Sequence, residues 1–324
     1  MELIEFLREK NDFVSGQEIA DAMHISRNAI WKQIERLRKE GIEIEAVTGK
    51  GYRIVDASDA FGEKAIKSFL HTSWLGRELL FFDEIDSTND ELKRRADKGA
   101  GEGLVAVADI QSKGKGRRGR AWETPAGVNI AMSYLLRPRL SPDIAPMMTL
   151  IMAMAAAKGI KEVSSLDARI KWPNDIVING KKLVGILTEM TAEPDYIHEV
   201  IVGTGMNINT ESFPDEIKDT ATSLLIEGGR RYSRAKVVAA VTDAFEKYYE
   251  IFCTTGDLSM MREDYNAACV NTGAEVRVLD PKGEYDGMAK GIDNRGELIV
   301  IKEDGSETRV YAGEVSVRGI YGYV

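Results

Sequence analysis

Residues 111–122 read Gln-Ser-Lys-Gly-Lys-Gly-Arg-Arg-Gly-Arg-Ala-Trp, and this stretch decides which folds the chain can have. Five cations and three glycines lie between Lys113 and Arg120, with no acid among them. The stretch contains Gly-x-Gly-x-x-Gly, but a dinucleotide-binding fold requires a helix that begins at the third glycine. Here Thr-Pro-Ala-Gly at residues 124–127 leads into another apolar run, so that interpretation fails. A kinase is also excluded, because no His-Arg-Asp or Asp-Phe-Gly follows, and there is no Walker loop.

The basic loop at residues 111–122 leaves two interpretations open. Its glycines let the backbone approach an anion that the arginines grip, or it is a solvated basic patch on the surface. Ser87-Thr88-Asn89 follows the apolar run 79–85 and is placed to cap the next helix, which brings hydroxyl and amide groups to a helix N-terminus. By itself this triplet is only a capping signature.

A lysine lies just after a predicted hairpin turn. Lys-Trp-Pro-Asn-Asp at residues 171–175 leads through an apolar run to Asn179-Gly180, a strong hairpin signal. Strict alternation then predicts Lys182 on the same face as Val184 and Ile186. A lysine on an apolar face either extends its ammonium to the edge or pairs with a buried anion, and the first arrangement is the commoner.

The chain has 324 residues and a formal net charge of −9, a length typical of two or three domains. The acidic total excludes a uniformly basic nucleic-acid binder, and positive charge is concentrated in residues 26–40 and 113–120. The N-terminus has no signal-peptide pattern, the apolar run 145–157 is too short for a membrane helix, and the two cysteines form no framework. We therefore expect a cytoplasmic protein with no membrane partner.

Residues 1–57 have the pattern of a winged helix-turn-helix domain. A short helix is expected at 17–23 with Ser15 as its N-cap, and a longer helix capped by Ser26 carries an apolar stripe to Glu40. Alternating runs on either side of residues 48–51 predict the hairpin wing. The second helix of such a pair lies in the DNA major groove. The residues nearest the bases would be Ser26, Arg27, Asn28 and Lys32, while Lys50 on the wing would contact phosphate. The alternative is an interaction domain with a solvated basic face.

Residues 62–271 alternate amphipathic helices with apolar β-branched runs, which predicts a mixed α/β domain. Residues 272–324 have short alternating runs between turns, which predict a small SH3-like β-barrel of five or six strands. The whole chain is thus expected to be an α+β protein of three domains. In the central domain we expect helices at 63–70, 89–97, 146–163 and 234–252, and strands at 104–110, 128–136, 169–172, 175–178, 182–188 and 199–207.

These segments together resemble the bifunctional biotin protein ligases that also repress the biotin operon. The resemblance covers essentially the whole chain, and the basic loop followed by Lys-Trp-Pro-Asn-Asp at this separation is specific to that family. It implies a catalytic domain of the biotin/lipoate ligase type that activates biotin with ATP and Mg²⁺ to biotinyl-5′-AMP. The biotinyl group then passes to a lysine of a biotin carboxyl carrier protein domain. Operator DNA is the implied partner of the head, with a homodimer forming when the adenylate is bound.

The resemblance also implies roles for individual residues. Lys182, Arg117 and Asp175 would be catalytic, with Asp175 either a Mg²⁺ ligand or a group that positions the target amine. Lys115 departs from the family pattern, which has arginine at this position, and lysine keeps the charge but loses the bidentate fork. Biotin would be bound by Ser87, Thr88, Asn89, Gln111, Lys115, Gly116, Arg117, Lys182 and Gly185, and ATP by Arg117, Arg120, Trp122, Lys171, Asn174 and Asn207.

Two other functions compete with this one. A repressor that senses biotin or its adenylate without ligating it would not need cations that compensate phosphate charge, so the basic loop and Lys182 argue against it. A lipoate protein ligase, which has a related fold, would lack both this loop and the winged head.

Overall fold

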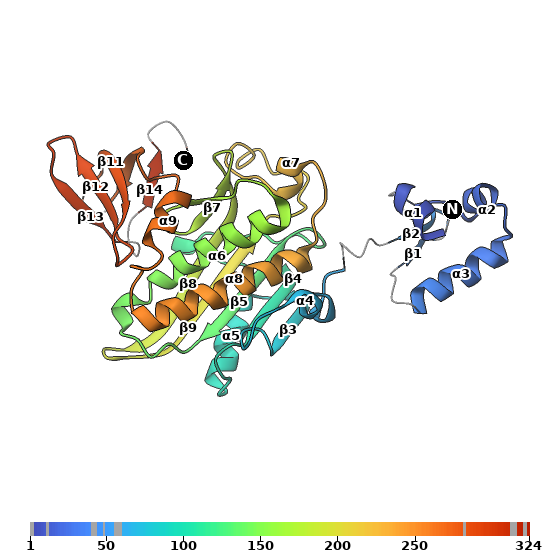
Figure 1. Cartoon of the computed structure of the whole chain (residues 1–324), viewed down its shortest axis with the longest axis horizontal. Coiled ribbons are helices and arrows are strands. Elements are labelled where there is room, and N and C mark those ends of the chain that lie inside the picture. The colour runs from blue at the N-terminus through green and yellow to red at the C-terminus, as the bar shows by residue number, and fades with distance from the viewer. Residues whose placement is uncertain are drawn as a thin grey trace.

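The structure is a computed structural model that describes residues 3–10, 13–39, 44–47, 49–54, 60–280, 283–311, 316–319 and 323–324. Its N-terminal part consists of three helices and a hairpin (Figure 1). These elements are α1 (Leu3–Lys10), α2 (Gly16–Met23), α3 (Arg27–Lys39), β1 (Ile44–Val47) and β2 (Gly51–Ile54). The order confirms the winged helix-turn-helix pattern. The predicted ends at residues 40, 42, 43 and 55 lie outside the described residues.

The N-terminal part has a hydrophobic core of its own. Ile30, Ile34 and Leu37 of α3 are buried there, as their spacing predicts. Both predicted caps are present: the Ser15 hydroxyl accepts the amide of Glu18 at 3.1 Å, and that of Ser26 accepts the amide of Ala29 at 3.3 Å. Each cap satisfies a backbone donor that has no partner within the helix, which fixes where α2 and α3 begin.

The central part is a seven-stranded sheet in the order β3-β4-β5-β9-β8-β7-β6. Only β3 and β4 are parallel, so the sheet is mixed. All the helices and strands predicted here are present within a few residues, except that the β8–β9 hairpin extends well beyond its predicted tip. The strands are β3 (Leu79–Ile85), β4 (Val105–Gln111), β5 (Ile130–Leu136), β6 (Arg169–Lys171), β7 (Asp175–Ile178), β8 (Lys181–Glu193) and β9 (Tyr196–Met206).

Helices cover the two faces of this sheet unequally. The long helices α6 (Met147–Ser164) and α8 (Arg234–Thr255) pack on one face and form the main core (Figure 1). The segment 142–164 is long and apolar enough to cross a membrane, but 72% of its most apolar window is buried inside the protein. On the other face α5 (Thr88–Asp97) packs through Leu92 and Ala96. The remaining helices are α4 (Glu63–Phe69), α7 (Leu224–Gly228) and α9 (Arg262–Ala268).

The C-terminal part is an antiparallel sheet of five strands in the order β13-β12-β11-β10-β14. Its buried side chains belong to the same hydrophobic cluster as the central core. Trp172 joins the two parts, because its indole donates to the carbonyl of Gly296 at 3.1 Å, while its amide donates at 2.8 Å to Oδ1 of Asn271, the last residue before the C-terminal part. The strands are β10 (Glu275–Leu279), β11 (Tyr285–Ile292), β12 (Leu298–Lys302), β13 (Glu307–Val310) and β14 (Ser316–Gly319).

Candidate active site

Three glycines on β8 and β9 form the floor of the candidate site. Gly203, Gly205 and Gly185 lie on the face of the sheet that carries α5, where Gly205 pairs with Gly185. A Cβ atom at Gly203 would overlap the side chain of Asn89, and one at Gly205 would overlap the indole of Trp122. At Gly185 it would lie 2.9 Å from the same indole. The glycines therefore let side chains from α5 and the basic loop lie directly on the sheet.

A polar network closes one end of this floor. The amide and hydroxyl of Thr88 both donate to Oε1 of Gln111, at 2.8 and 3.0 Å. The hydroxyl of Ser133 lies 2.7 Å from that of Thr88 and 2.6 Å from Oδ1 of Asn89. Nδ2 of Asn89 donates to Glu189 at 2.7 Å. Because Ser133 has one proton for two acceptors, an acceptor is left for the N–H of a neutral ligand. Sequence reasoning missed Ser133, although a serine in an otherwise apolar strand is a signal.

The basic loop forms a small hairpin over the site. The amide of Gly116 donates to the carbonyl of Arg120 at 2.7 Å, and that of Trp122 donates to the carbonyl of Gly114 at 2.9 Å. A Cβ atom at Gly114 would overlap the carbonyl oxygen of Trp122. Gly114 is therefore needed where the two arms of the hairpin approach each other closely. The sequence did not predict this role. Arg117 then reaches the floor, where Nη1 donates to Oδ1 of Asn174 at 2.8 Å. Burial lowers the pKa of its guanidinium.

The prediction for the face of Lys182 was wrong. Val177 of β7 pairs with Lys182, but Ile176 pairs with Val184, so that Leu183 is an extra residue in β8. Such a bulge interrupts the alternation, and Lys182 lies on the face opposite Val184 and Ile186. Its ammonium therefore enters the site.

Lys182 is paired with a carboxylate of the protein. Nζ lies 2.7 Å from Oδ1 of Asp175 and 5.6 Å from the ring of Trp122. Of the two arrangements considered for this lysine, pairing with an anion is the one found. Asp175 and Lys182 come from β7 and β8, which the predicted turn at Asn179-Gly180 joins.

Two adjoining cavities share the basic loop and Lys182. All the residues predicted to bind biotin line the first cavity, and those predicted to bind ATP line the second, with one exception. Asn207 lines neither cavity; it is buried, and its side-chain oxygen accepts from Asn129 at 3.3 Å. Gly116, Arg117, Trp122, Asn174 and Lys182 line both cavities.

The second cavity is strongly cationic. Among the described residues that line it, Asp175 is the only acid. Tyr323 enters it from the C-terminal part and donates its hydroxyl to Oδ2 of Asp175, while Nζ of Lys171 lies 3.5 Å from the centre of the tyrosine ring. No local signal marks Tyr323 as a site residue. Since five cations face one acid, the cavity is suited to a polyanion such as a nucleotide polyphosphate. These cations are Arg117, Arg118, Arg120, Lys171 and Lys182.

The winged head presents a polar surface on α3. Residues 26, 27, 28 and 32, which the sequence predicts to contact DNA, are all exposed, as is Lys50 at the tip of the wing. Trp31 lies on the same helix and is 57% exposed, although an indole is normally buried at least in part. Sequence reasoning overlooked this tryptophan, and its place between Asn28 and Lys32 was the available signal.

Comparison with known proteins places this site in a family. Residues 81–207, which contain the basic loop, Lys182 and the floor glycines, match the model of the biotin/lipoate A/B protein ligase family. The bifunctional ligase/repressor BirA of Bacillus subtilis is 41% identical over 98% of this chain and 98% of its own. The chain belongs to the biotin/lipoate A/B protein ligase family.

Further matches extend over the other parts of this ligase-family chain. Residues 1–53 match an HTH domain model, and residues 272–318 match the biotin protein ligase C-terminal domain. A biotin–[acetyl-CoA-carboxylase] ligase from Mycobacterium tuberculosis is 31% identical over 74% of this chain and 88% of its own. The biotin protein ligase of Aquifex aeolicus, solved in complex with biotin and ATP, has a TM-score of 0.67 and 28% identity, covering 75% of this chain and 99% of that one.

Magnesium fits the ligase site only in a limited way. Within the described part of the chain, no group of three or more His, Cys, Asp or Glu side chains is arranged to hold a metal. Asp175, the one carboxylate among the described residues that line either cavity, is already engaged by Lys182 and Tyr323. Mg²⁺ commonly uses one or two carboxylates together with substrate phosphates. The residues therefore fit a metal that arrives with a nucleotide.

Proposed function

We propose that this chain activates biotin with ATP to biotinyl-5′-AMP and transfers the biotinyl group to a lysine of a biotin carboxyl carrier protein domain. The observation that carries the proposal is the pair of adjoining cavities that share Arg117 and Lys182. One is capped by neutral hydrogen-bonding groups that suit a ureido ring, and the other collects cations that suit a polyphosphate. The Aquifex relative bound to biotin and ATP supports the same assignment.

The first step requires two anions to approach each other. A carboxylate oxygen of biotin forms a bond to the α-phosphorus of ATP, and the bond from that phosphorus to the bridging oxygen breaks as pyrophosphate leaves. Arg117 and Lys182 lie at the junction of the cavities, where this contact would occur. Their positive charge compensates the charge that accumulates in the transition state, and the low dielectric of a closed site strengthens the effect.

The second step transfers the acyl group. The neutral amine of the acceptor lysine attacks the carbonyl carbon of the mixed anhydride, the bond to the phosphate oxygen breaks, AMP leaves and the nitrogen loses a proton. Water would hydrolyse the same anhydride, so the hairpin of the basic loop must cover it until the acceptor arrives. Asp175 lies beside Lys182 in the second cavity, so it would either orient the incoming amine or help to hold Mg²⁺.

Mg²⁺ is proposed as the ion that accompanies ATP. When bound, it neutralises phosphate charge during nucleotidyl transfer. Asp175 is the residue of this chain that would contribute to holding it, and the cations of the second cavity bind the remaining phosphate oxygens.

Pyrophosphate release is the most direct test. The purified protein with biotin, MgATP and α-labelled ATP is expected to release pyrophosphate and to retain labelled adenylate, which a biotin carboxyl carrier domain then discharges. Release that depends on lipoate instead of biotin would replace this proposal with lipoate ligation. Binding of biotin without pyrophosphate release would mean that the protein senses biotin without ligating it.

A second function is favoured by the winged head. We propose that residues 1–57 bind operator DNA and that the adenylate promotes a homodimer whose two heads read a palindrome, since one such module covers too little DNA for tight binding. We further propose that the protein works in the cytoplasm, where ATP and DNA are available. A gel shift with DNA upstream of the biotin genes should depend on biotin and ATP, and sedimentation should show dimers only with adenylate. DNA binding that does not depend on the adenylate would rule out control of repression by the adenylate.

A further inference from the structure

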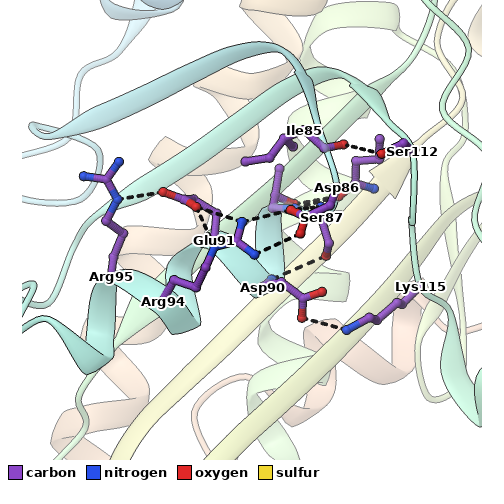
Figure 2. A network of polar contacts seen from close by, with 11 residues as sticks. Ile85, Asp86, Ser87, Asp90, Glu91, Arg94, Arg95, Ser112 and Lys115 are labelled. Carbon is purple, nitrogen blue, oxygen red and sulfur yellow. Dashed lines mark hydrogen bonds and ion pairs between the residues drawn. The ribbon is translucent and has the colours of Figure 1, made fainter.

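Lys115 is held by a carboxylate of the protein. Its ammonium lies 2.6 Å from Oδ1 of Asp90, in the first turn of α5, directly after the Ser87-Thr88-Asn89 cap (Figure 2). The contact joins the basic loop to the helix whose N-terminus lines the first cavity. Arg117, two residues farther along the loop, is held by Asn174 in the second cavity. The loop is thus attached by side chains at both ends of the site.

The base of the loop is fixed to the same segment by its backbone. The amide of Ser112 donates to the carbonyl of Ile85 at 2.9 Å, and that of Lys113 donates to the carbonyl of Asp86 at 2.8 Å. The hydrogen bond to Asp90 is the main reason why the pKa of Lys115 is raised. The charges of Glu189 and Asp86 act in the same direction, so the protein itself stabilises the ammonium without any ligand.

We propose that Asp90 is a positioning residue that holds Lys115, and with it the biotin end of the basic loop, against α5 before any ligand binds. The inference rests on the proposed function only for the identity of the ligand. Biotin brings a carboxylate that shares the ammonium of Lys115, but adenylation turns this carboxylate into an uncharged acyl group. Asp90 keeps its charge through that change, so Lys115 retains a counter-ion while the loop covers the adenylate.

The strength of the contact suits a loop that must reopen. The side chains of Lys115 and Asp90 are 47% and 29% exposed, so water weakens their attraction. Loss of such a pair is expected to change the open population of the loop by about two- to fivefold. A much stronger pair would hinder the release of product and the access of the acceptor.

Limited proteolysis of the ligand-free full chain tests this directly. The loop contains Lys113, Lys115, Arg117, Arg118 and Arg120, so trypsin reports its exposure. Asp90→Asn should be cleaved in the loop about two- to fivefold faster than the wild type. Added salt should raise the wild-type rate towards that of the variant, because screening weakens the ion pair between Lys115 and Asp90, and should change the variant less, because the variant lacks this pair. Asp90→Asn should also lose preformed biotinyl-AMP faster.

Two further variants separate positioning from a general effect of charge. Asp83→Asn removes the same charge from an exposed position on β3 and should be cleaved like the wild type. Lys115→Arg keeps the ion pair and should also be protected. Equal cleavage of Asp90→Asn and the wild type in the absence of ligand would overturn the inference. Because this readout needs no substrate, a wild type that fails to release pyrophosphate would contradict the proposed function and leave the inference standing.

Discussion

Nζ of Lys182 lies 2.7 Å from Oδ1 of Asp175, across the β7–β8 hairpin. The positive charge of the ammonium is therefore balanced by the carboxylate before substrates bind. An entering α-phosphate must share the ammonium with this carboxylate. Asp175 has a second partner, because its other oxygen accepts from Tyr323. As Tyr323 belongs to the C-terminal part, that part is connected to the proposed catalytic lysine through a single carboxylate.

Removing the charge of Lys182 should abolish adenylation while preserving the fold. We expect Lys182→Ala to lower the rate of biotin-dependent pyrophosphate release by about 10² to 10³-fold, the usual effect of losing one group that stabilises transition-state charge. Tyr323→Phe keeps the ring and loses only the hydroxyl, so it should have a much smaller effect. Thermal melting of both variants checks folding. A Lys182→Ala protein with near-normal activity would remove this lysine from the mechanism.

The glycine floor makes a second prediction. Gly205→Ala places a methyl group where the indole of Trp122 lies, so the tryptophan must move into the cavities. We expect the KM for biotin to rise at least about tenfold, because a displacement of about 1 Å at a binding site is costly. Gly101→Ala is the matched control, since a Cβ atom there meets nothing within 4 Å. An unchanged KM in Gly205→Ala would show that the indole is free to leave the floor.

Local signals were sufficient for most of the fold. The cap at Ser87 and the turn at Asn179-Gly180 define α5 and the β7–β8 hairpin, because each satisfies backbone geometry within a few residues. The short helices α7 and α9 were missed, since neither is long enough to show a hydrophobic period. The long tip of β8–β9 was missed because residues 190–196 are exposed on both faces, so no buried face marks them as strand.

The site was predictable only where a motif carries it. The bulge at Leu183 depends on pairing with a neighbouring strand, so alternation along β8 alone placed Lys182 on the wrong face. Tyr323 is brought to the second cavity from a distant part of the chain, and no local pattern marks it. Ser133 is marked only as a serine in an apolar strand, and its contacts with Thr88 and Asn89 depend on tertiary packing.

A third prediction concerns the ion pairs that support α5. Arg94 donates to both oxygens of Asp86 at 2.9 Å, and this hydrogen-bonded pairing lowers the pKa of the carboxyl from 3.8 to about 2 (Figure 2). The folded pKa lies below the unfolded one, so the stabilisation is present above about pH 4 and is lost as the pH falls towards 2. Both side chains are more than a third exposed, which reduces the benefit to about 0.5 to 1 kcal/mol.

Urea unfolding of Asp86→Asn at several pH values checks this. The variant should unfold at lower urea than the wild type at pH 7, and the difference should shrink between pH 4 and pH 2. Asp83 is exposed and forms no ion pair within the described part of the chain, so Asp83→Asn should show no such dependence on pH. A constant difference across this range would mean that Asp86 acts through packing and not through its charge.

The last prediction separates two kinds of DNA contact made by the head. Trp31 on α3 is 57% exposed, and an indole in the major groove can contact a thymine methyl group, whereas Lys50 on the wing is expected to neutralise a phosphate. Trp31→Ala should weaken binding to the operator by about tenfold and reduce the difference in affinity between the operator and unrelated DNA. Lys50→Ala should weaken binding to both DNAs alike and reduce the slope of log K against log salt by about 1. Pyrophosphate release should remain at the wild-type rate in both, because neither residue lines the ligase cavities. Equal loss on both DNAs in Trp31→Ala would show that the tryptophan does not read sequence.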